Sequence, residues 1–167
     1  MKVVFHDDFY QVYTSDPAAE QGRMEAVVEV LGPHVEFITA QEASDSDIAA
    51  VHTPGQIDYV KMHGLHPIAT LAAGGAIQAA TIGLVEPCFG LIRPPGHHAS
   101  ANSSWGFCYY NNMAVALAYL KREEKISNAY VLDIDLHYGD GTVNILGNKN
   151  YVHIHNLGTS DRNAYLR

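Results

Sequence analysis

Short apolar runs alternate with helix-like segments along almost the whole chain, and this alternation constrains the fold more than any other feature. The runs have the length of buried strands, and the segments between them carry apolar residues at helical spacing or are rich in alanine. The strand-like runs are residues 2–5, 35–38, 88–92, 129–132 and 151–154, and the helix-like segments are residues 21–31, 54–63, 68–82, 111–122 and 142–146. Strands that alternate with helices form right-handed βαβ units. The sequence therefore predicts an α/β fold, a parallel sheet flanked by helices, with a site at the carboxyl ends of the strands.

Residues 1–167 are expected to form a single domain. A chain of 167 residues that is 47% hydrophobic and 17% charged can bury one core, and no repeat, linker or low-complexity segment divides it. Within this domain, Ser44–Asp47 is predicted to be a polar turn. Glycines at positions 74, 75 and 83 weaken the prediction of a helix over residues 68–82, because glycine disfavours helix interiors.

Charge and cysteine content narrow the function classes. The net charge of −8 is opposite to the basic surface that follows nucleic-acid phosphates, so direct nucleic-acid binding is not expected. The same charge suits a cationic substrate, although it also serves plain solubility. The N-terminus cannot form a signal segment, and no later stretch is apolar for long enough to span a membrane. Cys88 and Cys108 are predicted to be reduced, packed thiols, which fits the cytoplasm.

Asp133, Asp135 and His137 alternate with apolar residues directly after the apolar run 129–132. Side chains alternate across an extended segment, so these three share one face. Two carboxylates held side by side repel each other unless a cation or hydrogen-bond donors compensate. Oxygen and nitrogen donors together suit zinc or another divalent transition metal. The competing interpretation is a solvated acidic loop.

A second group is the adjacent pair His97 and His98, which follows Arg93, two prolines and a glycine. The prolines stiffen the loop, so the two imidazoles can be held in one rigid arrangement suited to proton transfer. Each imidazole needs a partner on its outer nitrogen, and Asp133 and Asp140 are available carboxylates. The alternative is an ordinary surface loop, which a lone pair of histidines more often indicates.

The segment Trp105–Asn112 also permits two interpretations. It can be a glycine turn with core aromatics, in which an asparagine caps the helix that follows. Alternatively, Gly106 and Phe107 line a narrow apolar tunnel beside a metal. A redox role for Cys108 is disfavoured, because no basic residue lies nearby in the sequence.

Three motifs in this order and spacing closely resemble the zinc-dependent histone deacetylase family, which also contains acetylpolyamine amidohydrolases. They are Arg93–Ala99 (Arg-Pro-Pro-Gly-His-His-Ala), Gly106–Asn112 (Gly-Phe-Cys-Tyr-Tyr-Asn-Asn) and Asp133–Gly141 (Asp-Ile-Asp-Leu-His-Tyr-Gly-Asp-Gly). A weaker match extends from residue 1 and includes Arg23, at the position of a family arginine near an internal channel. The resemblance implies an arginase-like α/β fold and one zinc ion per complete site.

The resemblance also implies roles for individual residues. His98 would be the general base that activates water, and His97 would be its electrostatic or acid partner. Asp133 would orient His97, and Asp140 would orient His98. The zinc ligands would include Asp135 and His137, and the acyl-amine tunnel would be bordered by Gly106 and Phe107.

The chain departs from the family pattern toward its end. A third zinc ligand, an aspartate, and an oxyanion-stabilising tyrosine lie further downstream in the family, and the setting of Asp161 does not match either motif. Where many relatives have a serine that helps to hold potassium, this chain has His153, so a potassium site of the usual form is not expected. We expect the N-terminal portion of a deacetylase domain, with a second polypeptide or a homo-oligomer covering its open sheet edge.

Three hypotheses follow. The first is a zinc amidohydrolase that removes acetyl groups from acetyl-lysine or acetylated polyamines. The second is an inactive fragment or pseudoenzyme that serves as a binding or assembly unit. The third is a binuclear manganese ureohydrolase, which is disfavoured because Gly139 occupies a position where such sites carry an aspartate.

Overall fold

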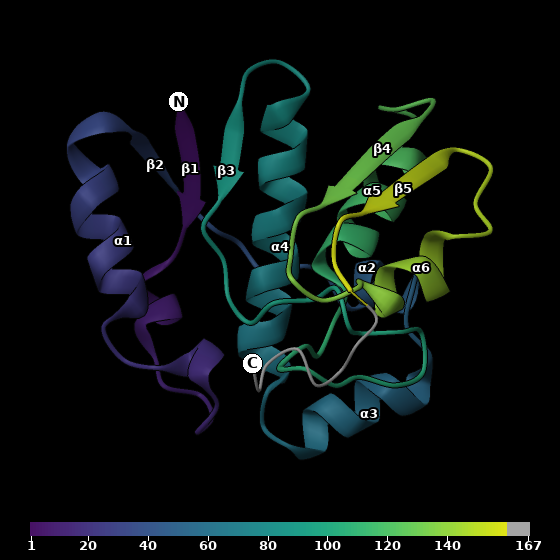
Figure 1. Cartoon of the computed structure of the whole chain (residues 1–167), viewed down its shortest axis with the longest axis horizontal. Coiled ribbons are helices and arrows are strands. Elements are labelled where there is room, and N and C mark those ends of the chain that lie inside the picture. Colours follow the sequence, from purple (N-terminus) through teal and green to yellow (C-terminus); the bar gives the residue numbers. More distant parts are fainter. Residues whose placement is uncertain (160–167) are drawn as a thin grey trace.

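Two separate parallel sheets form the frame of the molecule in a computed structural model that describes residues 1–159. The first sheet has the order β2-β1-β3 and the second consists of β4 and β5 (Figure 1). Every pairing within them is parallel, as predicted. The strands are β1 (Lys2–Phe5), β2 (Glu36–Thr39), β3 (Cys88–Gly90), β4 (Ala129–Asp133) and β5 (Val152–Asn156).

The predicted parallel sheet flanked by helices is therefore confirmed, but the sheet is divided. Successive strands β3 and β4 are not hydrogen-bonded to each other in the part of the chain that the structure describes. In Figure 1, α4 lies in the interval between the two sheets, α5 lies behind the second sheet, and α1 covers the outer side of the first one. The helices are α1 (Arg23–Leu31), α2 (Asp45–Ala49), α3 (Pro54–Met62), α4 (His66–Gly83), α5 (Asn112–Arg122) and α6 (Asp140–Leu146), with 3-10 turns η1 (Asp7–Tyr10), η2 (Pro17–Ala19) and η3 (Gly32–His34).

The prediction of a polar turn at Ser44–Asp47 is wrong, because this segment begins helix α2. The Ser44 hydroxyl accepts a hydrogen bond from the Asp47 backbone N–H at 3.2 Å, and an Asp47 carboxylate oxygen accepts one from the Ser44 N–H at 3.1 Å. This reciprocal arrangement is a capping box, which satisfies two backbone donors that a helix start otherwise leaves unpaired. A cluster of short polar residues can therefore start a helix as readily as it forms a turn.

Glycine is required inside α4 by the close approach of another segment. A Cβ at Gly74 would lie 1.9 Å from the Gln41 carbonyl oxygen and 2.5 Å from the Ala43 nitrogen. Gly74, one of the glycines that weakened the helix prediction, thus allows the chain after β2 to pass directly against the helix. The predicted helix is confirmed. It is 18 residues long, and its side chains take part in two of the buried core clusters.

The buried core has three connected parts. One lies between β1, α1 and α4, a second joins α2 and α3 to α4 and α5, and a third lies beneath β4 between α5 and α6. Because the strands are parallel, their carboxyl ends point the same way, toward the loops that carry the histidine pair (Figure 1). Within residues 1–159, no helix combines the length and the apolar character that crossing a bilayer requires.

Candidate active site

The loop that carries the two histidines is anchored by the buried side chain of Arg93. Its guanidinium donates hydrogen bonds to the backbone carbonyls of Phe9, Gln11 (3.1 Å) and Glu20 (3.0 Å). These acceptors lie in the N-terminal segment, far from Arg93 in the sequence. The loop is therefore fastened at its start to a separate part of the fold.

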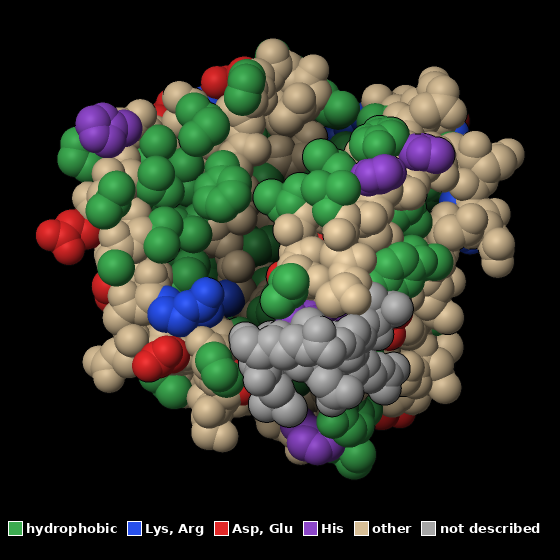
Figure 2. Space-filling view, in the orientation of Figure 1, with side chains coloured by type: hydrophobic (Ala, Val, Ile, Leu, Met, Phe, Trp, Pro, Cys, Tyr) green, Lys and Arg blue, Asp and Glu red, His purple; other side chains and the backbone are tan. Residues whose placement is uncertain are grey.

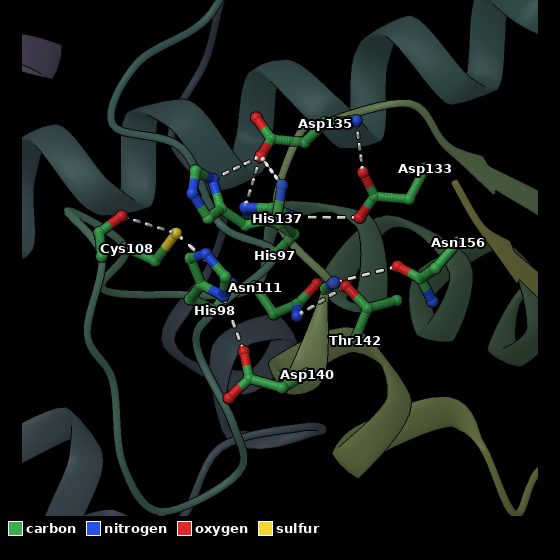
Figure 3. A network of polar contacts seen from close by, with 12 residues as sticks. His97, His98, Cys108, Asn111, Asp133, Asp135, His137, Asp140, Thr142 and Asn156 are labelled. Atoms are coloured by element: carbon green, nitrogen blue, oxygen red, sulfur yellow. Dashed lines mark hydrogen bonds and ion pairs between the residues drawn. The ribbon is translucent and has the colours of Figure 1, made fainter. Parts of the chain in front are cut away.

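His97 and His98 lie in contact, with ring centroids 4.0 Å apart, and each is bonded to a different carboxylate (Figure 3). The Nδ1 atom of His97 is 2.9 Å from an Asp133 oxygen, and the Nδ1 atom of His98 is 2.6 Å from an Asp140 oxygen. Asp133 ends β4 and Asp140 begins α6, so two elements that follow each other in the chain hold the pair in place. The predicted pairing of each histidine with its carboxylate is thus present in the structure.

Their environments move the pKa values of the two histidines in opposite directions. Burial has the largest effect and lowers the pKa of His98; the hydrogen bond to Asp140 opposes this lowering, and a positive charge on His97 adds to it. Burial also disfavours a charged His97, but the hydrogen bond to Asp133 and the nearby carboxylates outweigh it and raise the pKa of His97. The pKa of Asp133 is lowered, because hydrogen bonds from His97 and the Asp135 N–H overcome the cost of its burial. Opposed shifts in adjacent groups are typical of an acid and a base.

Asp135 and His137 provide donors for a metal ion beside this pair. An Asp135 carboxylate oxygen lies 3.2 Å from His137 Nδ1 and 3.9 Å from His97 Nε2. Two ligands of one tetrahedral zinc ion with bonds of about 2.0–2.1 Å lie roughly 3.3 Å apart, so the spacing of the Asp135 and His137 donors fits zinc. Across residues 1–159 no group of three or more His, Cys, Asp or Glu side chains is arranged to hold a metal. These residues thus fit part of a zinc site.

Gly106 and Phe107 lie on the turn before α5. Both have positive φ angles, 58° and 65°, a region that non-glycine residues rarely adopt. A Cβ at Gly106 would lie 2.4 Å from His98 Cδ2, so only glycine lets this turn approach the imidazole. The structure therefore places Gly106, one of the two predicted substrate-binding residues, against the predicted base.

A family model described as the histone deacetylase domain matches residues 18–165. The chain belongs to the histone deacetylase family.

Similar proteins support this assignment. A probable deacetylase of Archaeoglobus fulgidus is 34% identical over 184 residues, covering 90% of this histone deacetylase family chain and 49% of the relative. Human polyamine deacetylase HDAC10 is 29% identical over 174 residues, which cover 83% of this chain and 26% of the relative. The crystal structure of the HDA15 HD domain superposes with a TM-score of 0.81 at 27% identity, covering 95% of this chain and 54% of that one. The chain thus spans about half the length of the first of these relatives.

The structure of this deacetylase family chain corrects or completes several expectations. The exposed His153 side chain, on β5, stacks on Tyr130, with ring centroids 5.2 Å apart. In the strand register, the residue of β5 opposite Asp133 is Asn156 and not His153. Gly139 has no side chain to offer a second manganese ion, and the Asp133 carboxylate fills the space where one would begin. Asp161 lies outside the described residues.

Two buried or half-buried residues near the pair were missed as contributors to the site. Trp105 contacts both His98 and Asp140, and its only sequence signal was its place next to Gly106. His52 joins the carbonyl of Ser100 to the N–H of Asn111. The expectations for Asn111 and Cys108 hold for the described structure: Asn111 caps α5, and the Cys108 thiol is buried, which raises its pKa to about 12.

Proposed function

We propose that this chain supplies the histidine pair and two zinc ligands of a zinc-dependent hydrolase that removes acetyl groups from acetyl-lysine or acetylated polyamines. The observation that carries the proposal is the pair of contacting histidines, each bonded to its own carboxylate, beside Asp135 and His137. Membership of the histone deacetylase family supports deacetylation as the reaction class.

In this proposal His98 is the general base. Its Nδ1–H donates to Asp140, so the lone pair of Nε2 is free to take a proton from the attacking water. The Nε2 atom is buried and has no hydrogen-bond partner among residues 1–159. This is the state a base requires before the substrate arrives.

His97 is the cationic partner. Because the hydrogen bond to Asp133 and the nearby carboxylates raise its pKa, His97 takes up a proton more readily than a free imidazole does. In its protonated form it would stabilise negative charge on the reacting carbonyl oxygen and return a proton to the leaving amine. Asp133 fixes the orientation of His97 through the bond to its Nδ1 atom. The two histidines thus divide the tasks of base and acid.

Asp135 and His137 would hold the zinc ion, which when bound supplies a Lewis acid that polarises the amide carbonyl and acidifies water. Gly106 and Phe107 would border the acyl chain as it approaches His98. Zinc is the metal we propose for this site, and the position of His153 lends no support to an additional potassium ion.

A second polypeptide, or a second copy of the chain, is proposed to complete the site. A trough of about 940 Å³ separates β3 from β4, with a floor of small and apolar side chains from α4 and α5. Figure 2 shows the hollow between the two sheets, with apolar side chains on its walls. Strand edges that face such a trough tend to pair with other strands. His97 and Asp135 line the same trough, so strands added there would reach the metal ligands.

The experiment measures zinc content and acetate release by the protein purified from its own source, together with any polypeptide that accompanies it. The substrates are a fluorogenic acetyl-lysine peptide and acetylputrescine. We expect stoichiometric zinc, hydrolysis of one substrate or both, and loss of hydrolysis in His98→Ala. A zinc-loaded protein that cleaves neither substrate would refute the substrate assignment. We also propose a cytoplasmic location, which the two free thiols support.

The alternative proposal is a binding or assembly unit without catalytic activity. Its supporting observation is that the described residues contain two suitable zinc donors beside the pair and lack a third. Intact-mass measurement of the native assembly distinguishes the two. A monomer of 18.2 kDa that binds no zinc favours the inactive unit, and a larger zinc-containing assembly favours the hydrolase.

A further inference from the structure

Trp105 contacts both members of the His98–Asp140 pair. Its Nε1–H donates a hydrogen bond to Asp140 Oδ2 at 2.9 Å, and the other oxygen of that carboxylate is bonded to His98. The indole ring also stacks on the His98 imidazole, with centroids 3.8 Å apart and planes 31° from parallel. The three side chains therefore form a closed triangle in which each touches the other two.

This triangle limits the motion of both partners. Each carboxylate oxygen of Asp140 has one bonded donor, which fixes the plane of a side chain that is otherwise 37% exposed. The His98 ring has His97 within 4.0 Å and Trp105 within 3.8 Å, measured between ring centroids. Rotation of the His98 ring would have to displace aromatic neighbours as well as break the bond to Asp140.

Trp105 is itself held on both sides. The buried side chain of Gln56, in α3, donates hydrogen bonds to Ser104 Oγ and to the Tyr109 carbonyl, both at 2.9 Å. The Cys108 N–H donates to the Trp105 carbonyl at 3.0 Å. The indole is thus carried by a loop that is fastened to a helix, rather than by a free surface segment.

We propose that Trp105 is a positioning residue of the hydrolytic site, which fixes the Asp140 carboxylate and the plane of His98 so that Nε2 is presented in one orientation and one tautomer. The proposal rests on the proposed function only in taking His98 as the base. Trp105 lies outside the three sequence motifs, so its proposed role does not follow from them.

The test uses the 167-residue chain without metal, labelled with ¹⁵N-histidine, at one fixed pH. The shifts of the two ring nitrogens report the tautomer of His98, which is assigned by its absence in His98→Gln. Trp105→Phe keeps an aromatic ring but cannot donate a hydrogen bond, and Trp105→Leu removes both contacts. Ser104→Ala is the matched control, because it loosens the same loop and leaves the indole in place.

We expect the wild-type chain to hold a single tautomer with the proton on Nδ1. In Trp105→Phe the Asp140 carboxylate loses the donor that fixes its plane, so a second tautomer of His98 should become detectable. In Trp105→Leu the ring-current displacement of the His98 carbon-bound protons should also disappear. Ser104→Ala should resemble the wild type.

Wild-type nitrogen shifts in both tryptophan variants would overturn the proposal, and so would a Ser104→Ala spectrum that changes as much as that of Trp105→Phe. If Trp105→Leu does not fold, Trp105→Phe decides the question alone. These spectra need neither zinc nor substrate, so a failure of the proposed hydrolysis leaves them interpretable. Conversely, unchanged spectra would not affect the proposed roles of zinc and the histidine pair.

Discussion

His52 should make the chain lose stability as the pH falls below 6.5. The side chain is buried, its Nδ1 atom lies 3.1 Å from the Ser100 carbonyl oxygen, and its Nε2 atom accepts a hydrogen bond from the Asn111 N–H at 2.9 Å. Burial lowers its pKa from 6.5 to about 4, against the smaller opposing effect of hydrogen bonds to the backbone carbonyls. Protonation of Nε2 would also remove the lone pair that accepts the hydrogen bond from the Asn111 N–H.

The sign and size follow from proton linkage. Between pH 6.5 and 4 the unfolded chain binds a proton at His52 that the folded chain does not, so stability falls as the pH falls. A tenfold change in a proton-binding constant corresponds to about 1.4 kcal/mol, so a pKa lowered from 6.5 to about 4 amounts to roughly 3 kcal/mol once the pH is well below 4. From pH 7 to pH 5 the expected loss is about 2 kcal/mol.

Urea unfolding at pH 7 and pH 5 measures this effect in the wild type and in His52→Gln. We expect the stability advantage of the wild type over the variant to shrink by about 2 kcal/mol at pH 5, because the variant has no proton to bind at this position. His34→Gln, which removes an exposed histidine, is the control. The expected change of about 2 kcal/mol exceeds the ordinary error of such measurements. A stability advantage that is the same at the two pH values within roughly 0.5 kcal/mol would therefore refute the assigned role of His52.

Three further outcomes are expected. Gly74→Ala should lower the free energy of unfolding by about 3 kcal/mol or more, because its Cβ has no space beside the Gln41 carbonyl; thermal unfolding measures this, and an unchanged melting temperature would contradict the packing. A thiol reagent should label Cys88 well before Cys108, whose thiol is buried and has its pKa raised to about 12; equal labelling rates in the folded chain would be evidence against that environment. Asp135→Ala should weaken zinc binding in equilibrium dialysis by at least tenfold, because it removes one of two donors, and unchanged affinity would exclude Asp135 as a ligand.

Much of the fold could be predicted because its elements are local. The helix over residues 54–63 begins with a proline after a threonine cap, and Asn111 caps α5, so in both cases neighbouring residues carry the signal. The pairing of strands is different, since it depends on contacts that the alternation of elements does not encode. The sequence could therefore predict β3 and β4 but not that a trough divides them.

In the candidate site too, residues within one motif could be predicted from the sequence, whereas contacts between distant segments could not. The motifs predicted both histidines and their carboxylates, which the structure brings within hydrogen-bonding distance. The indole of Trp105 reaches Asp140 across 35 residues of sequence, and no spacing rule predicts that contact. Single side chains that link two motifs are found only when the loops are placed in space.

The chain contains one tryptophan, and this residue lies against His98. Its intrinsic fluorescence is therefore an unlabelled optical signal from a single place in the molecule, directly beside the proposed base. Emission intensity can follow metal addition, acyl-amine binding or the docking of another polypeptide in real time. This signal comes from beside the histidine pair and needs no engineered label.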